Sequence, residues 1–194
     1  MEKVPISVSI LEKLKAIFQK KGSKVISGLS RLFKVTEITG KGRRGEIIPF
    51  LEGLSLQGIE ITKEESSDLI NLLDTDQDNL INFDKFLYII IGKPNIRRQS
   101  IIDKAFLKID KDCLGFLTPK EIKMVYNFQN HPHVKLGQKN EEEVFKDFMQ
   151  NFGGKSDEDK IFRIEWNDYY SAVSSYIDND DHFILLMKNA WKLD

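Results

Sequence analysis

The twelve residues 110–121 space their oxygen-bearing side chains in a pattern that few folds can use. Asp110 and Asp112 stand at positions 1 and 3 of this run, and Glu121 stands at position 12. Gly115 stands at position 6. A calcium loop of this length needs oxygens at positions 1, 3 and 5, a backbone carbonyl at 7, a glycine at 6 and a bidentate Glu at 12. The run therefore predicts a calcium-type loop between two helices.

Such a helix–loop–helix unit is an EF-hand, and its 110–121 loop lacks one ligand. Leu114 occupies position 5, where a side-chain oxygen is required. The remaining protein donors are Asp110, Asp112, the Phe116 carbonyl and Glu121. The sequence leaves open whether binding is measurable. We expect any calcium binding here to be weak, and no cofactor to be required.

A second run, 74–85, keeps the early ligands and loses the last one. Its positions 1, 3 and 5 are Asp74, Asp76 and Asp78. Lys85 stands at position 12, which removes two oxygens and brings a cation to the place of an anion. We expect impaired calcium binding. We also expect the Lys85 ammonium to pair with Asp74 or Asp76 in place of an ion.

The two other loops lack most of the donors. In 36–50, basic residues stand where carboxylates are needed, and Pro49 falls near position 12. In the last loop, Glu165 can take position 12 and Ile161 position 8, but position 1 is then Gly154. The neighbouring Asp157 and Asp159 are out of phase with the ligand positions. Both loops are predicted not to bind an ion.

The helix–acidic loop–helix unit recurs along the chain, and a recurring unit indicates an array of similar motifs. Ile10, Leu14 and Phe18 lie at helical spacing and predict a first amphipathic helix at about 6–20. We predict an all-α fold of two EF-hand lobes with an extra N-terminal helix and a C-terminal docking helix. The predicted parts are the N-terminal helix 1–21, an EF-hand pair 22–92, a linker 93–96 and a second pair with the C-terminal helix 97–194.

The segment 180–194 is predicted to be the docking helix. Asp180 or Asp181 can cap its start. Its apolar face comprises Phe183, Leu186, Met187, Ala190 and Trp191. Because this face is continuous over several turns, we expect the helix to fold back onto the C-terminal lobe.

Charge is spread unevenly along the chain. The net charge is −1, with +5 in residues 1–60 and −6 in residues 61–194. Lys41, Arg43 and Arg44 concentrate the positive charge, and we predict that they contribute to a partner-binding surface. The alternative is an ordinary solvated basic face. A near-neutral chain without a recognised module argues against nucleic-acid binding.

Two other features limit the range of functions. No run approaches the roughly 18 apolar residues of a membrane span, so no membrane partner is expected. The segment 129–138 contains His131 and His133 without a third metal ligand, and we predict an ordinary loop rather than a zinc site. No nucleophile motif or phosphate loop is present, so we predict that the chain is not an enzyme.

Several stretches outside the loops resemble calcyphosin, a family with four EF-hands. They are 104–110, Val125–Tyr126 followed by His131–Pro132, Asn151–Phe152, 168–174 and 190–193. The resemblance covers about residues 22–194 and is strongest from 97 onward. It implies two EF-hand lobes, a calcium-binding ancestry and a cytoplasmic location. The association of such proteins with ciliated cells implies a role in the cilium.

Two functions are consistent with these features. In the first, degenerate loops hold the lobes in one state, and the chain is a constitutive structural or adaptor protein for a protein partner. By resemblance, that partner would lie on the axoneme or on tubulin in ciliary microtubules. In the second, the chain is a calcium-responsive regulator that uses the 110–121 loop. We favour the first because so few oxygen donors remain.

Overall fold

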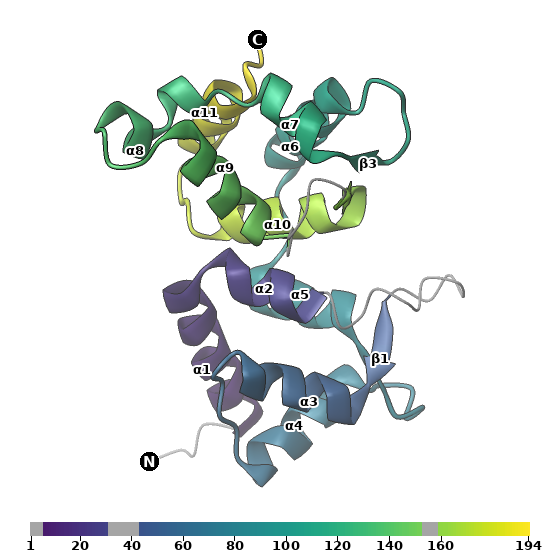
Figure 1. Cartoon of the computed structure of the whole chain (residues 1–194). Coiled ribbons are helices and arrows are strands. Elements are labelled where there is room, and N and C mark those ends of the chain that lie inside the picture. The colour runs from purple at the N-terminus through teal and green to yellow at the C-terminus, as the bar shows by residue number, and fades with distance from the viewer. Residues whose placement is uncertain (1–5, 31–42, 153–158) are drawn as a thin grey trace. The chain divides into compact units, whose positions relative to one another are not determined.

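The computed structural model describes residues 6–30, 43–152 and 159–194. The chain divides into two compact units, Met1–Lys93 (the first unit) and Pro94–Asp194 (the second unit) (Figure 1). Both consist mainly of helices joined by loops, and the short strands lie within those loops. The predicted fold class, an all-α protein of paired helix–loop–helix units, is confirmed.

In the first unit, one helix precedes the helix–loop–helix segments. The elements are α1 (Ile6–Lys21), α2 (Ser23–Ser30), β1 (Arg44–Glu46), α3 (Ile47–Leu56), α4 (Lys63–Leu73), β2 (Leu80–Asn82) and α5 (Phe83–Ile91). Strands β1 and β2 pair antiparallel, with Gly45 opposite Ile81. Because each strand leads directly into a helix, this pairing holds α3 and α5 in a fixed relation.

Local sequence explains where two of these helices begin. The Thr62 hydroxyl accepts the Glu65 N–H, and the Glu65 carboxylate accepts the Thr62 N–H, so α4 starts with a capping box. The Asn82 side chain accepts the Lys85 N–H at 2.9 Å and starts α5. Helix α5 ends at Ile91, and the C-cap residue Gly92 has a φ of 74°, which favours glycine.

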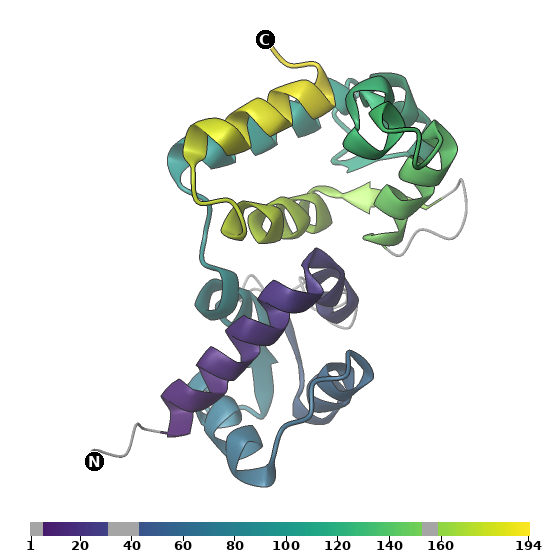
Figure 2. The same cartoon turned by 90° about the vertical axis from the view of Figure 1, so that its left-hand side faces the viewer.

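Helix α1 lies against α4 and α5 and completes the core of the first unit (Figure 2). Ile10, Leu14 and Phe18 are at most 1% exposed. The Phe18 ring meets Phe86 of α5 edge-on, with 5.8 Å between centroids. Each such side chain contributes roughly 1.5–3 kcal/mol through burial. The predicted extra helix is therefore part of the core, and it covers the apolar faces of α4 and α5.

The second unit has a similar order of elements with a helix added at its end. The elements are α6 (Ile96–Ile109), β3 (Phe116–Leu117), α7 (Pro119–Val125), η3 (Phe128–Asn130), α8 (Pro132–Lys135), α9 (Glu141–Gln150), β4 (Ile161–Phe162), α10 (Arg163–Ser175) and α11 (Asp180–Trp191). The segment 129–138, predicted as a loop, contains the short helix α8. Pro132 is its first residue, a position where the missing N–H has no cost.

Helix α11 is the docking helix predicted from the sequence, and it lies along α6 (Figure 2). Phe183, Met187 and Trp191 are at most 2% exposed, whereas Leu186 of the predicted face is 44% exposed. The Trp191 Nε1–H donates to the Tyr170 hydroxyl at 2.8 Å, which satisfies two buried polar groups together. Burial raises the pKa of Tyr170 well above its ordinary value, so this hydroxyl stays protonated.

A buried arginine joins the start of α6 to the α10–α11 connection. Arg98 Nε donates to Asp180 at 2.6 Å, and Nη1 donates to the Ser174 carbonyl at 2.6 Å. Nη2 donates to the Asp178 carbonyl at 3.1 Å. The guanidinium lies 5.2 Å from the centroid of the Phe183 ring. These contacts satisfy a buried cation and fix the place where α11 begins.

The cap of α11 differs from the prediction. Asn179 is the N-cap, and its side chain accepts the His182 N–H at 2.8 Å. Asp180 and Asp181 lie in the first turn instead. The expectation that one of them caps the helix was wrong, because Arg98 engages the Asp180 carboxylate. Carboxylates in the first turn still favour the helix through its dipole.

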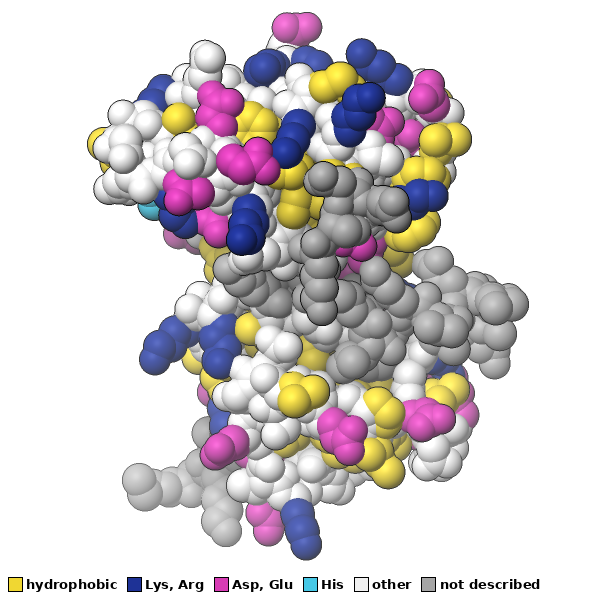
Figure 3. All heavy atoms as spheres, viewed as in Figure 1, with side chains coloured by type: hydrophobic (Ala, Val, Ile, Leu, Met, Phe, Trp, Pro, Cys, Tyr) yellow, Lys and Arg dark blue, Asp and Glu magenta, His cyan; other side chains and the backbone are white. Residues whose placement is uncertain are grey.

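Charged side chains of both signs are interspersed on the face shown in Figure 3. Elsewhere in the second unit, charged side chains pair locally, as Lys123 does with Glu142 at 3.1 Å and Arg163 with Asp103 at 3.0 Å. Exposed pairs of this kind contribute at most about 1 kcal/mol each. Among the residues described, no helix is both long enough and apolar enough to cross a bilayer.

Replacing Trp191 by Ala should destabilise the second unit by about 3–5 kcal/mol, because it removes a fully buried ring and leaves the Tyr170 hydroxyl without its donor. Leu185 lies on the exposed side of the same helix, so Leu185→Ala should change the free energy of unfolding by no more than about 0.5 kcal/mol. Urea unfolding followed by circular dichroism measures both values. Equal midpoints for the two variants would contradict a docked α11.

Candidate functional site

The strand pair of the first unit fixes the register of its two loops. Ile81 is position 8 of the loop 74–85 and lies opposite Gly45. Since the two loops are related by this pairing, Gly45 takes position 8 of the first loop and Pro49 takes position 12. A proline there supplies no carboxylate to an ion. The early ligand positions of this loop lie outside the described residues.

The loop 74–85 has the backbone of an ion-binding loop. The Asp74 carboxylate accepts the N–H of Asp78 at 3.1 Å and that of Asn79 at 3.0 Å. Gln77 and Asn79 adopt left-handed φ values of 56° and 64°. Asn tolerates this region better than most residues, which explains why it can replace the usual glycine. The turn is therefore formed by the protein's own hydrogen bonds.

A guanidinium from the partner loop lies against two carboxylates of this loop. Arg44 Nη2 donates to Asp76 at 2.5 Å, and Nη1 donates to Asp78. The Arg44 side chain is only 11% exposed. The hydrogen bond to Asp76 raises the pKa of Arg44, so its charge is retained. A cation of the protein therefore neutralises two of the three side chains that would ligate calcium.

Lys85 does not have this role. Its backbone N–H donates to Asn82 at the start of α5, and its ammonium forms no ion pair within the described part of the chain. The expected pairing of Lys85 with Asp74 or Asp76 is thus corrected to a pairing by Arg44. The signal was present in the sequence: once Gly45 is aligned with Ile81, Arg44 falls beside the acidic loop.

Arg43 is buried in its own unit. Its side chain is 4% exposed, and Nε and Nη2 donate to Asp84 Oδ1 at 2.8 and 2.6 Å. Its guanidinium lies 4.9 Å from the centroid of the Phe83 ring. Neither Arg43 nor Arg44 is presented to solvent as a basic face, and Lys41 lies outside the described residues. Their partner-binding role stays a prediction.

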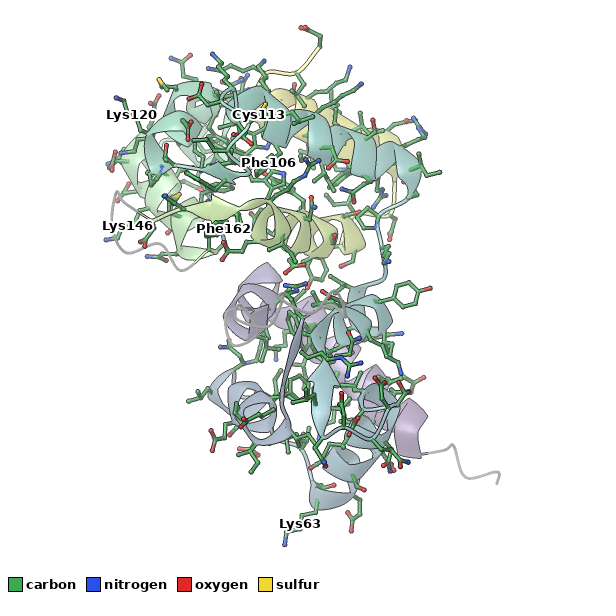
Figure 4. All side chains as sticks on the ribbon, turned by 90° about the vertical axis from the view of Figure 1, so that its right-hand side faces the viewer. Lys63, Phe106, Cys113, Lys120, Lys146 and Phe162 are labelled. Carbon is green, nitrogen blue, oxygen red and sulfur yellow. The ribbon has the colours of Figure 1, made fainter. Side chains whose placement is uncertain are left out.

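The loop 110–121 has the same backbone as its counterpart in the first unit. The Asp110 carboxylate accepts the N–H of Leu114 at 2.8 Å and that of Gly115 at 2.9 Å. Cys113 and Gly115 adopt left-handed φ values of 53° and 77°. Cys113 is an exposed free thiol, and Figure 4 shows it on this loop. The loop is therefore shaped to receive an ion.

The donors of this loop are not gathered around one point. Asp112 is exposed, and Leu114 at position 5 is 57% exposed. Glu121 Oε2 accepts the Thr118 N–H at 2.7 Å and the Thr118 hydroxyl at 2.6 Å, which forms a capping box at the start of α7. Within the described residues, no three His, Cys, Asp or Glu side chains are placed to hold a metal. The donor types fit calcium, but Glu121 must leave its cap to bind it.

The last loop repeats this use of its glutamate. Ile161 lies opposite Leu117. This pairing gives Ile161 position 8 and Glu165 position 12, as predicted from the sequence. Glu165 is 7% exposed, and its Oε2 accepts the Phe162 N–H at 2.9 Å at the start of α10. Residues 153–158, which contain the early ligand positions, lie outside the described residues. In both loops of the second unit, the position-12 carboxylate stabilises a helix start.

Comparison with known proteins gives a match that extends along nearly the whole chain. Crustacean calcium-binding protein 23 of Faxonius limosus is 27% identical over 184 residues, which cover 93% of this chain and 90% of that protein. No family model matches the chain. The similarity thus extends over both units, with a protein that is named for calcium binding.

Plant kinases match a smaller part. Calcium-dependent protein kinase 7 of Oryza sativa subsp. japonica is 25% identical and calcium-dependent protein kinase 22 of Arabidopsis thaliana is 24% identical, each over 147 residues. These alignments cover 74% of this chain but only 26% and 28% of the kinases. With the paired helix–loop–helix units, the similarities support an EF-hand type of protein. They do not single out the calcyphosin family.

Replacing Arg44 by Gln should raise the calcium affinity of the loop 74–85 about fivefold, because it removes a competing unit charge from Asp76 and Asp78. Adding Lys85→Glu should raise it further by restoring the bidentate ligand. Isothermal titration with calcium measures both effects. Arg97→Gln is the matched control, since it breaks an exposed Arg–Asp pair in the second unit. Unchanged titrations in both Arg44 variants would refute competition by Arg44.

Proposed function

We propose that this chain is a constitutive adaptor of the EF-hand type that binds a protein partner while its loops hold the helices in one arrangement. The observation that carries this proposal is the Arg44 guanidinium against Asp76 and Asp78. An EF-hand switch works because the ion draws the position-12 Glu and its helix toward the loop. In the first unit, position 12 is Pro49 or Lys85, so calcium has no carboxylate there with which to move α3 or α5.

The added helices support a fixed form. Helix α1 covers the apolar faces of α4 and α5, and helix α11 covers α6. In a calcium sensor, ion binding exposes an apolar groove for a target helix. Here helix α1 of the first unit and helix α11 of the second unit take the place that a target helix would occupy. A partner would therefore bind surfaces other than these covered faces.

A second function, calcium-responsive regulation, is favoured by the backbone of the loop 110–121. Asp110 already orders the turn through its two backbone hydrogen bonds. The donors that would hold calcium are Asp110, Asp112, the Phe116 carbonyl and Glu121. A bound ion would supply positive charge at this loop and draw Glu121 away from Thr118. The name of the crustacean relative points in the same direction.

The partner in our proposal is a protein, and neither nucleic acid nor membrane is included. The resemblance to calcyphosin alone motivates a cytoplasmic setting on the ciliary axoneme, where acidic tubulin surfaces would suit the excess positive charge of residues 1–60. No catalytic role is proposed. The relative that covers most of the chain is named a calcium-binding protein, and the kinases are matched over about a quarter of their length.

Calcium titration of the full chain should give at most a weak signal from the loop 110–121, and Glu121→Gln should abolish it by removing the bidentate ligand. Glu165→Gln is the matched control, because Glu165 also caps a helix but belongs to a loop with Gly154 in place of the position-1 carboxylate. It should leave the titration unchanged. Micromolar binding together with increased exposure of apolar surface, measured by dye fluorescence, would favour the sensor instead.

Recovery of the protein partner should not depend on calcium. We expect the same proteins, in the same amounts, from cell extracts with calcium and with a chelator, because the ion has no switch to operate in the first unit. Quantitative mass spectrometry of the two samples measures this. Partners that are recovered only with calcium, and that are lost in Glu121→Gln, would establish the regulatory function.

A further inference from the structure

The second unit contains a cavity of about 440 Å³ that is lined by no residue of the loop 110–121. It is lined by residues from the segment η3–α8 and from helices α10 and α11. Small-molecule sites in proteins commonly span roughly 300–1,000 Å³. The cavity is therefore large enough for a small ligand.

Its inner walls are apolar. Val173 on α10, Ile177 after it and Ala190 on α11 are half-buried, whereas Phe183 and Met187 are at most 2% exposed. Tyr126 stands at the other side, where its ring lies 5.0 Å from Trp191. These residues belong to the hydrophobic core or pack against it. An alkyl or aromatic group in the cavity would thus gain contacts of the kind that stabilise the core.

The wall formed by the η3–α8 segment is tied to α11. The Asn127 N–H donates to the Ala190 carbonyl at 2.8 Å, and the Asn127 amide donates to the Asn189 carbonyl at 3.1 Å. At the start of α8, the His131 ring accepts the His133 N–H at 3.3 Å. These bonds order the segment without a ligand. A preformed cavity costs less free energy to fill than one that must first be ordered.

The charged groups that line the cavity favour an anion. Lys135 is the lining cation, and among the described residues no Asp or Glu lines the cavity and no ion pair engages Lys135. Because His131 Nδ1 accepts a backbone N–H, the neutral ring carries its proton on Nε2 and keeps a donor. Burial, then the positive charges of His133 and Lys139, lower the pKa of His131, while Asp147 opposes them.

We propose that this cavity binds a small amphipathic carboxylate, with the carboxylate at Lys135 and His131 and the alkyl or aryl body against Val173, Ile177 and Ala190. The apolar walls and the Lys135 ammonium each match one half of such a ligand. The proposal concerns a free small molecule and is independent of calcium binding and of the protein partner.

Decanoate is the probe, with decanol and decylamine as matched controls of the same chain length. Both tryptophans of the chain lie in the second unit, and Trp191 is hydrogen-bonded to Tyr170, which lines the cavity. Tryptophan emission of the full-length protein should therefore report entry of the ligand. Decanoate should bind more tightly than decanol, and decylamine should bind most weakly.

Lys135→Met removes the charge, keeps the side-chain length and should weaken decanoate binding about threefold to fivefold, which is the effect of an exposed charge pair. Its affinity for decanol should not change. Lys146→Met is the control, since Lys146 lies on the exposed side of α9 (Figure 4) and does not line the cavity. Both lysines are exposed, so both variants should fold.

Three binding results would overturn the proposal. The first is equal binding of decanoate and decanol, and the second is equal weakening by Lys135→Met and Lys146→Met. The third is binding of an acidic peptide with no binding of decanoate, which would make the cavity an anchor for a protein. Backbone chemical shifts that change outside the lining residues but not among them would also exclude this site.

Discussion

Each unit depends on a short antiparallel pairing between its two loops. The pairs Gly45–Ile81 and Leu117–Ile161 join segments far apart in the sequence. Because a shift of one residue would turn every side chain of a strand to its other face, this pairing strictly sets which residues of the two loops meet. In the first unit it brings Arg44 to the carboxylates of the partner loop. Arg44 takes the place of a calcium ion because the strand register brings it beside Asp76 and Asp78. Its positive charge alone would be compatible with any exposed position.

The two units use their loops in different ways. In the first, a guanidinium provides the positive charge, and position 12 holds Pro49 or Lys85. In the second, Glu121 and Glu165 remain at position 12 but accept hydrogen bonds at the starts of α7 and α10. Ligation and helix capping therefore compete for the same carboxylate. A loop that is already short of one donor at Leu114 must also break a cap to bind, which favours a resting state without an ion.

Local patterns in the sequence were enough to predict the helical fold, the turn around Asp110 and the docking of α11. Each depends on spacing within one segment: oxygen donors along a loop, or apolar residues along a helix face. The cation at Asp76 and Asp78 was misassigned to Lys85 because the correct partner comes from another loop. The cap of α11 was misassigned for a similar reason, since Arg98, about 80 residues earlier, engages Asp180. Patterns within single segments could not reveal these long-range polar contacts, and the Arg44 contact required the two loops to be aligned with each other.

Because α1 and α11 cover apolar faces of the two units, they compete with any foreign helix for those faces. A helix tethered to its own binding face acts at an effective concentration that is typically of millimolar order. If a foreign helix and α11 each bound the bare face with a dissociation constant of about 1 μM, the tether would weaken the foreign helix about a thousandfold. Cleavage or displacement of either terminal helix would remove that competitor. Helices α1 and α11 thereby limit which other helices the two units can bind.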